Sequence, residues 1–249
     1  MKCTVFSAML RGPRNRQEDC LLSGTDLFQK DTLKQTKTLD TDFLAASVCD
    51  GLGGHDNGES ASRFVCEQLQ ARFREGPFDP QNIRTVLAEI QAAAQGRLPE
   101  NCGTTVAGLM IKNGRVIAFN AGDSRVYKIT ASGMTYVSHD HSLVQGLVDN
   151  ALIQKDAANS HPLKNFVDFG IGPLFQDVWK DYAVHVFEDS LGADACYLIC
   201  SDGVHDLMNE AEMHEILMPS PAENGQALIA ALEKKGLRDN TSFIILETR

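Results

Sequence analysis

The sequence lacks long hydrophobic runs and is poor in basic residues. No stretch approaches the roughly 18 apolar residues that a membrane-spanning helix needs, and arginines follow the first apolar segment before it reaches the length of a signal peptide. There are 23 Lys and Arg against 33 Asp and Glu, which gives a formal net charge of −10. A surface of that sign repels nucleic-acid phosphates. We therefore expect a cytoplasmic protein with neither a membrane nor a nucleic acid as its partner.

The cysteines also exclude two kinds of small-protein architecture. They are seven, an odd number, and none of them form a C-x-x-C pair: Cys3, Cys20, Cys49, Cys66, Cys102, Cys196 and Cys200. Neither a disulfide framework nor a zinc knuckle is indicated. Cysteines of this kind are expected as small buried hydrophobic residues.

What the sequence does contain is typical of a globular enzyme-sized domain. Its 249 residues include 43% hydrophobic and 22% charged residues, enough to bury a substantial core. It shows neither internal repeats nor a Gly/Ser-rich linker, so we expect residues 1–249 to form a single domain.

The hydrophobic pattern predicts both strands and helices. Strands are expected at residues 2–9, 43–49, 104–111, 115–121, 124–130, 134–138, 182–187, 195–200 and 241–248. Helices are expected at residues 57–73, from the Asp79-Pro80 cap to about Gln95, and in a tail that ends near Lys235. The polar stretch 30–42 is expected as a loop or hairpin end, and residues 141–170 as mixed helix and loop. This order predicts an α+β fold with stacked antiparallel sheets and helices outside.

Four acidic clusters follow or interrupt apolar runs. They are Glu18-Asp19, Asp50-Gly51, Asp202-Gly203 and Asp239-Asn240. A carboxylate at a strand end, next to a glycine that lets a backbone carbonyl approach, suits a hard cation such as Mg²⁺ or Mn²⁺. Each cluster alone is more often an ordinary turn. Their combination, in this order and with these neighbours, carries more information.

The chain resembles the PPM-type (type 2C) metal-dependent protein phosphatases, particularly bacterial members, from Arg14 to the last strand. The matching segments are Arg14 to Asp19 for R-x-x-N-[EQ]-D, Asp50 to His55 for D-G-x-G-G-H, Gly103-Thr104-Thr105 for G-T-T, Gly122 to Arg125 for G-D-S-R, Asp140-His141-Ser142 for D-H-S, His161-Pro162 for H-P, Ser201-Asp202-Gly203 for S-D-G, and Asp239 to Ser242 for D-N-x-[TS]. The resemblance implies a four-layer αββα sandwich, with a flap-like segment near 141–180.

The resemblance also implies a function and a set of site residues. The activity would be hydrolysis of phosphoserine and phosphothreonine in proteins, opposing a serine/threonine kinase, with a metal-bridging hydroxide as nucleophile. The cofactors would be two Mn²⁺ or Mg²⁺ ions, with a third in many bacterial members. The implied metal ligands are Asp50, which bridges two ions, the Gly51 carbonyl, Asp202, Asp239, Glu18 and Asp19, with Asp123 and Asp206 for the third ion, and Arg14 would hold the substrate phosphate.

Three features depart from the family pattern. Gln17 stands where asparagine is usual, which changes a hydrogen bond near the metals and removes no ligand. Leu52 cannot donate a proton, although many eukaryotic members carry a histidine at this position as a proposed general acid. His55, which matches the family motif, is close to Leu52 in the sequence, and it is expected either to orient the glycine turn or to donate the proton that Leu52 cannot. The segment 165–176 lacks the usual threonine-containing run, which leaves substrate selectivity open.

Other functions fit the sequence less well. Asp168-Phe169-Gly170 matches the kinase D-F-G by its letters, but the other kinase motifs are missing, and the glycine-rich 50–58 stretch lacks the ending of a nucleotide-binding loop. His139 and His141 lack a second cluster that could complete a zinc site. The alternatives that stay open are a catalytically silent sensor module with this fold and a phosphatase that acts on a small phosphorylated metabolite.

Overall fold

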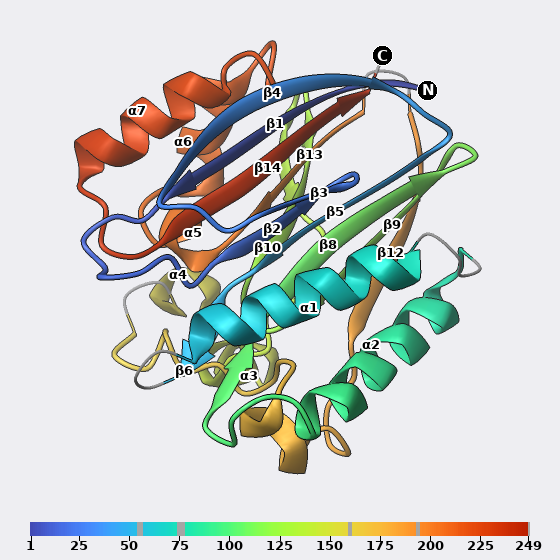
Figure 1. Ribbon diagram of the computed structural model, residues 1–249. Coiled ribbons are helices and arrows are strands. Elements are labelled where there is room, and N and C mark those ends of the chain that lie inside the picture. The colour runs from blue at the N-terminus through green and yellow to red at the C-terminus, as the bar shows by residue number, and fades with distance from the viewer. Residues whose placement is uncertain (54–56, 74–77, 159–160, 193–194, 249) are drawn as a thin grey trace.

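Two six-stranded antiparallel sheets lie face to face in the computed structural model, which describes residues 1–53, 57–73, 78–158, 161–192 and 195–248 (Figure 1). Sheet A has the order β11-β10-β13-β14-β1-β4. Its strands are β1 (Lys2–Leu10), β4 (Thr32–Asp40), β10 (Arg125–Thr130), β11 (Gly133–Tyr136), β13 (Cys196–Cys200) and β14 (Thr241–Thr248). Sheet B has the order β12-β9-β8-β5-β2-β3. Its strands are β2 (Cys20–Ser23), β3 (Asp26–Phe28), β5 (Phe43–Cys49), β8 (Val106–Lys112), β9 (Arg115–Ala121) and β12 (His185–Ser190).

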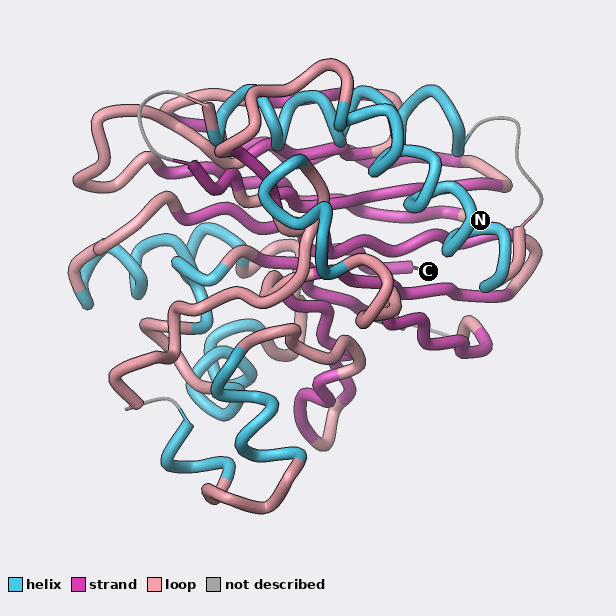
Figure 2. Tube along the Cα trace, turned by 90° about the horizontal axis from the view of Figure 1, so that it is seen from below, coloured by secondary structure: helices cyan, strands magenta, loops and turns pink. Residues whose placement is uncertain are grey.

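Helices cover the outer face of each sheet. On sheet B lie α1 (Gly58–Phe73) and α2 (Pro80–Gln95), and on sheet A lie α6 (Glu210–Leu217) and α7 (Gly225–Lys235) (Figures 1 and 2). The helix start predicted at Asp79 is confirmed, because its side chain accepts a hydrogen bond from the Asn82 N–H. The predicted α+β fold with an αββα order of layers is therefore confirmed.

Three apolar clusters fill the spaces between these four layers. Val48 and Ile244 are fully buried between the sheets, Leu69 and Phe119 between sheet B and its helices, and Leu228 of α7 between that helix and sheet A. Full burial of one such side chain contributes about 1.5–3 kcal/mol. All seven cysteines are free and buried, as expected. Among the described residues, no helix is both long and apolar enough to cross a membrane.

The prediction for residues 30–42 is wrong, because β4 is a nine-residue strand that pairs along its whole length with β1. β4 lies at the open edge of sheet A, and most of its side chains are exposed while Leu33 is buried. An edge strand that is solvated in this way does not need the apolar alternation by which strands are recognised. The short strands β2, β3, β6 (Gly51–Gly53) and β7 (Cys102–Thr104) also escaped the pattern.

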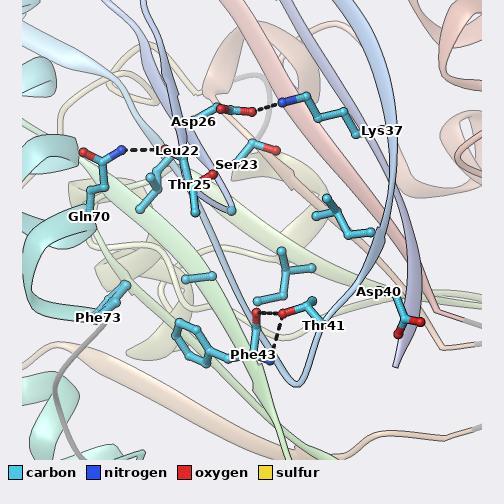
Figure 3. Close-up of a pocket in the computed structure, with 14 residues that line it drawn as sticks. Leu22, Ser23, Thr25, Asp26, Lys37, Asp40, Thr41, Phe43, Gln70 and Phe73 are labelled. Carbon is cyan, nitrogen blue, oxygen red and sulfur yellow. Dashed lines mark hydrogen bonds and ion pairs between the residues drawn. The ribbon is translucent and has the colours of Figure 1, made fainter.

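The remaining short elements gather at one end of the sandwich. They are α3 (Leu143–Asp149), α4 (Lys155–Ala158), the 3-10 helix η1 (Pro173–Val178) and α5 (Asp202–His205). A cavity of about 190 Å³ lies at the opposite end, between β2, β4, β5 and α1 (Figure 3). Its wall includes Leu22, Phe43 and Phe73, and the ion pair of Lys37 with Asp26 closes one side. The two ends of the sandwich therefore differ in chemistry.

Candidate metal centre

The strand registers bring four of the predicted acidic residues, Asp19, Asp50, Asp202 and Asp239, to one end of the sandwich, where strands of both sheets terminate. We call this end the acidic edge. Cys20 of β2 pairs with Cys49 of β5, so the next residues outward, Asp19 and Asp50, lie at the same edge of sheet B. In sheet A, Leu10 pairs with Thr241 and Cys200 with Phe243, which places Asp202 and Asp239 at one edge. The Ser201 hydroxyl donates to Asp19 Oδ2 at 3.0 Å and thus joins the two edges.

The G-T-T motif fixes the backbone at Asp50. The Asp50 carbonyl accepts from the Thr104 hydroxyl at 2.8 Å and from the Thr105 N–H at 2.9 Å, while the Thr105 hydroxyl accepts from the Asp50 N–H at 3.2 Å. Glycine is required next, because a Cβ on Gly51 would lie 2.2 Å from the Gly58 carbonyl oxygen and 2.7 Å from that of Glu18. The motif glycine therefore permits the close approach of three backbone segments.

The D-N motif fixes the loop that carries Glu18. Asn240 Oδ1 accepts from the Glu18 N–H at 2.7 Å, and Asn240 Nδ2 donates to the carbonyls of Arg11 at 2.8 Å and Arg16 at 3.0 Å. Gln17, which departs from the family pattern, accepts from the Asp19 N–H at 3.1 Å through its side-chain oxygen. The substitution therefore keeps a hydrogen bond beside Asp19.

The inner carboxylates of this edge lack positive partners. Asp19 is fully buried, Asp50 and Asp202 are half-buried, and no Lys or Arg of the described residues forms an ion pair with them. Burial raises the pKa of Asp19 to about 6, and burial together with Asp19 and Asp202 raises the pKa of Asp50 well above its usual value. Burial and Asp123 likewise raise the pKa of Asp202. Carboxylates that disfavour one another's charge need a cation.

The side-chain oxygens fit such a cation. Asp19 Oδ1 and Asp202 Oδ1 are buried and have no hydrogen-bond partner. Oxygen donors of this kind suit Mg²⁺ or Mn²⁺. Within the described ranges, no three His, Cys, Asp or Glu side chains lie close enough together to form a complete metal site.

Two outer carboxylates, in contrast, are paired with basic side chains. Asp239 and Asp206 are about one-third exposed, at 33% and 31%. Arg14 Nη2 lies 2.5 Å from Asp239 Oδ2, and Lys164 Nζ lies 2.5 Å from Asp206 Oδ2. Arg14, the predicted phosphate ligand, is thus held at the predicted centre by one of its predicted metal ligands.

A cavity of about 310 Å³ opens onto this edge. It is lined by Arg14, Lys164, Asn165, Asp202, Gly203, Asp206, Leu207, Arg238 and Asp239. A smaller cavity of about 40 Å³ adjoins it and shares Lys164, Asp202 and Asp206 with it, and Asp123 lies in the wall of the smaller one. The structure therefore brings the predicted ligands for the third ion to the same region as those for the first two.

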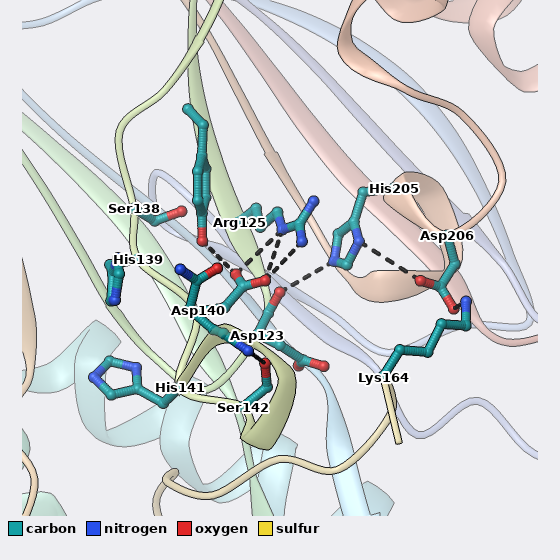
Figure 4. Close-up of polar contacts among 12 residues, drawn as sticks. Asp123, Arg125, Ser138, His139, Asp140, His141, Ser142, Lys164, His205 and Asp206 are labelled. Atoms are coloured by element: carbon teal, nitrogen blue, oxygen red, sulfur yellow. Dashed lines mark hydrogen bonds and ion pairs between the residues drawn. The ribbon is translucent and has the colours of Figure 1, made fainter. Parts of the chain in front are cut away.

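A buried polar network supports Asp123 (Figure 4). Arg125 donates to both oxygens of Asp140, at 3.0 Å and 3.1 Å from Nε, and Asp140 also accepts from the Tyr136 hydroxyl. His205 Nε2 lies 3.1 Å from the Asp123 carbonyl oxygen, and its ring is largely buried. Burial raises the pKa of Asp123 to about 7. The G-D-S-R and D-H-S motifs therefore build the support of one predicted ligand.

The segment 165–176 is tied to the G-T-T motif. Ile171 and Thr104 exchange backbone hydrogen bonds of 2.8 Å in both directions. Phe169, the aromatic residue of the kinase-like D-F-G letters, is fully buried against Trp179 and Tyr182. The phenylalanine of this D-F-G sequence thus serves in a packing contact of the core. Leu52 pairs with Gly103 in the β6–β7 ribbon, and His55 lies outside the described residues.

Sequence reasoning missed three side chains at this centre. Lys164 and Arg238 line the larger cavity, and His205 joins Asp123 to α5. Lys164 is 42 positions from its partner Asp206, so no local spacing signals the pair. His205 and Arg238 stand beside recognised motifs, in S-D-G-V-H-D and R-D-N, and that adjacency was the available signal.

The fold and the acidic edge define this chain as a phosphatase of the two-sheet, metal-dependent class. Residues 23–233 match the protein phosphatase 2C family, and the chain belongs to that family. This confirms the resemblance and the predicted enzyme class. The serine/threonine phosphatase stp of Listeria innocua is 30% identical over 213 residues, which cover 80% of this chain and 82% of that protein.

Solved structures show the same fold. Stp1 of Staphylococcus aureus superposes with a TM-score of 0.81 at 25% identity and covers 99% of this chain and 94% of its own. The catalytic domain of the phosphatase PstP, solved in complex with two manganese ions, has a TM-score of 0.74 at 24% identity and covers 99% of each chain.

Proposed function

We propose that this chain hydrolyses phosphoserine and phosphothreonine in proteins, with Mn²⁺ or Mg²⁺ as cofactor. The observation that carries the proposal is the acidic edge, where Asp19, Asp50 and Asp202 have no basic partner among the described residues, and where Asp202 lines the same cavity as Arg14. The serine/threonine phosphatases among its relatives, and the manganese ions in the PstP structure, support it. We further propose that it acts in the cytoplasm and opposes a serine/threonine kinase, a location with which seven free thiols agree.

The carboxylates have separate proposed roles. Asp50, the Gly51 carbonyl, Asp202 and Asp239 would hold one cation, with Asp50 shared between two. Glu18 and Asp19 would hold the second cation, directly or through water. Burial raises the pKa of Glu18, although Arg14 opposes this shift. Asp123 and Asp206 would hold a third cation, in the smaller cavity.

When bound, the two cations would activate a water for in-line attack and neutralise the charge on the phosphoryl oxygens. The chain's own contribution to substrate binding is Arg14, whose planar guanidinium can meet two phosphate oxygens. Asp239 holds this guanidinium beside the cavity at 2.5 Å. If Asp239 held a cation instead, the Arg14 donors would be available for phosphate.

The test is release of phosphate from phosphoserine and phosphothreonine peptides. We expect turnover with Mn²⁺ or Mg²⁺ and none after EDTA, since carboxylate and water shells exchange these ions. Okadaic-acid-type inhibitors, which suit other phosphatase families, should have no effect. Full activity in chelator would contradict metal dependence, and turnover of small phosphate esters without any peptide turnover would favour a metabolite as substrate.

Two variants test the assignment of ligands. Asp202→Asn and Asp239→Asn each remove an anionic ligand, so each should weaken Mn²⁺ binding in calorimetric titration and lower turnover by orders of magnitude. Circular dichroism should show that both variants fold. A variant with the wild-type rate at limiting Mn²⁺ would remove its residue from the site. A wild-type protein that binds Mn²⁺ and phosphopeptide without turnover would identify the silent sensor module instead.

A further inference from the structure

One arginine at the larger cavity has no hydrogen-bond or ion-pair partner among the described residues. Of the three basic side chains that line it, Arg14 is paired with Asp239 and Lys164 with Asp206. Arg238 is exposed, and no hydrogen bond or ion pair connects its side chain to the part of the chain that the structure describes. In a protein with a net charge of −10, an unpaired cation beside the proposed catalytic centre stands out from its surroundings.

The backbone that carries Arg238 is firmly held. The neighbouring residues are fixed by the three hydrogen bonds of the Asn240 side chain and by the bond of 3.1 Å from the Thr241 hydroxyl to the Asp239 carbonyl. On the other side of the chain, a Cβ on Gly12 would lie 2.5 Å from the Asp239 carbonyl oxygen, so the two loops are in close contact. The side chain of Arg238 is therefore free to reorient, while its origin stays at the rim of the cavity.

The chemistry of the cavity suggests what Arg238 binds. In the proposed function the aspartates hold cations and Arg14 holds the substrate phosphate, and Arg238 has no part in either task. A guanidinium is permanently charged and presents paired donors that match a carboxylate or a phosphate. Arg238 directly precedes Asp239, so a group that it meets lies within about two or three residues of the scissile phosphate, at about 3.3–3.6 Å per extended residue.

We propose that Arg238 is a specificity-determining residue that binds a second oxyanion of a phosphopeptide, next to the phosphorylated side chain. The oxyanion is the carboxylate of an acidic residue or a second phosphate group. This inference rests on the proposed function and names its substrate class, phosphopeptides with a neighbouring negative charge. Such a contact stabilises the substrate without touching the reacting atoms, so it acts on phosphopeptides and leaves small esters unaffected.

The experiment compares four substrates. They are a phosphothreonine peptide flanked by alanine, the same peptide flanked by glutamate, a peptide with a second phosphothreonine, and para-nitrophenyl phosphate. For Arg238→Ala we expect kcat/KM to fall by roughly 5–20-fold on the two peptides with a neighbouring charge, mainly through KM, in line with the loss of charged hydrogen bonds. Hydrolysis of the alanine-flanked peptide and of para-nitrophenyl phosphate should be unchanged. The peptide with the larger loss identifies the preferred oxyanion.

Two further variants sharpen the result. Arg238→Lys keeps the charge without the planar fork, so it should recover part of the loss. Arg97→Ala removes another exposed arginine, just beyond α2, and should change none of the four rates. Added salt should narrow the difference between wild type and Arg238→Ala on the glutamate-flanked peptide, because an exposed contact is screened.

A binding measurement separates this proposal from the proposed function. Fluorescence anisotropy with non-hydrolysable phosphonate versions of the peptides reports the contact without turnover. Tighter binding of the charged peptides by wild type than by Arg238→Ala supports the assignment even if no peptide is hydrolysed, and in that case only the proposed function fails. Hydrolysis and binding that do not distinguish charged from neutral peptides, or an equal loss on all four substrates, would overturn the role of Arg238.

Discussion

The inner and outer carboxylates of the centre differ in what offsets their negative charge. Asp19, Asp50 and Asp202 have no basic partner within the described ranges, and burial raises the pKa of each. Asp206 and Asp239 are one-third exposed, and each is paired with a basic side chain at 2.5 Å. If the proposed ligands are correct, the inner group would depend on an added cation, whereas a metal would have to displace the basic side chain from each of the two outer carboxylates.

The inner group should show the largest effect. Asp50→Asn removes the carboxylate proposed to be shared by two ions, so turnover should fall by on the order of 10³-fold, more than the ~10–100-fold typical of a residue that only supports a ligand. Mn²⁺ affinity should fall with it in calorimetry. Asp42→Asn, an exposed aspartate at the far end of the sandwich, is the matched control. Equal turnover in Asp50→Asn and Asp42→Asn would contradict the proposed role of Asp50 as the ligand shared by two ions.

The outer arginine should affect substrate more than metal. Arg14→Ala should raise the KM for a phosphothreonine peptide, with kcat/KM lower by roughly 10–100-fold, because charged hydrogen bonds to phosphate contribute about 1.5–3 kcal/mol. Mn²⁺ affinity should stay the same or rise slightly, since Arg14 no longer competes for Asp239. Arg14→Lys should recover part of the loss. Unchanged kinetics for Arg14→Ala would assign Arg14 to the solvated loop.

The pH dependence of the metal-free protein tests the burial of the inner group. Burial, partly offset by the hydrogen bond from the Ser201 hydroxyl, raises the pKa of Asp19 from 3.8 to about 6. Between these values the folded state holds more protons than the unfolded state, so the stability from this group is present at low pH and falls as the pH rises.

The measurement is thermal unfolding of wild type and Asp19→Asn in EDTA from pH 4 to pH 7. The difference in melting temperature should move in favour of the variant across this range, because asparagine does not acquire charge. Added Mn²⁺ should reverse the sign at pH 7 by stabilising the wild type. In the control Asp189→Asn no such gain is expected. Burial raises the pKa of Asp189, but the hydrogen bond and charge of Lys128, with the hydrogen bonds of Ser190 and Tyr197, together outweigh it and lower that pKa. A pH-independent difference for Asp19→Asn would contradict the argument.

The smallest expected effect belongs to Lys164. Lys164→Met removes the ion pair with Asp206, so the weakest Mn²⁺ site should bind up to roughly fivefold more tightly, since a partly exposed pair contributes only about 0–1 kcal/mol. The tighter Mn²⁺ sites should keep their affinity in the same titration. A change at the tighter sites alone would place Lys164 at a different carboxylate.

The sequence predicted the carboxylates of this centre better than their partners. Asp50 and Asp202 end apolar runs, and the ordered motifs connect them to Glu18, Asp19 and Asp239. Their placement at one edge agrees with the structure, while their roles stay proposals. The pairing of Lys164 with Asp206 depends on how the 141–180 segment folds over the centre, and nothing in local spacing encodes such a tertiary contact. The proposed role of that segment as a flap likewise stays a prediction.

The strands and helices likewise include some that the sequence predicted and some that it did not. Short runs rich in apolar, β-branched and aromatic residues identified β5, β9 and β13, and a cap identified α2, because each of these elements is buried over most of its length or on one side. Hydrophobic periodicity reports burial and does not report hydrogen bonding. β6 and β7, with three residues each, are too short to show a period, and they are held by their pairing with each other.

The polar character of β4 has a consequence for the behaviour of the protein in concentrated solution. One side of this strand has no neighbour in sheet A among the residues that the structure describes, so its backbone donors and acceptors could pair with a strand from another molecule. Lys34 and Lys37 along it form ion pairs with Glu233 and Asp26, and a second copy approaching edge to edge would have to desolvate these charged groups. The polar residues of β4, from which the sequence predicted a loop, thereby protect the open edge of the sheet against aggregation.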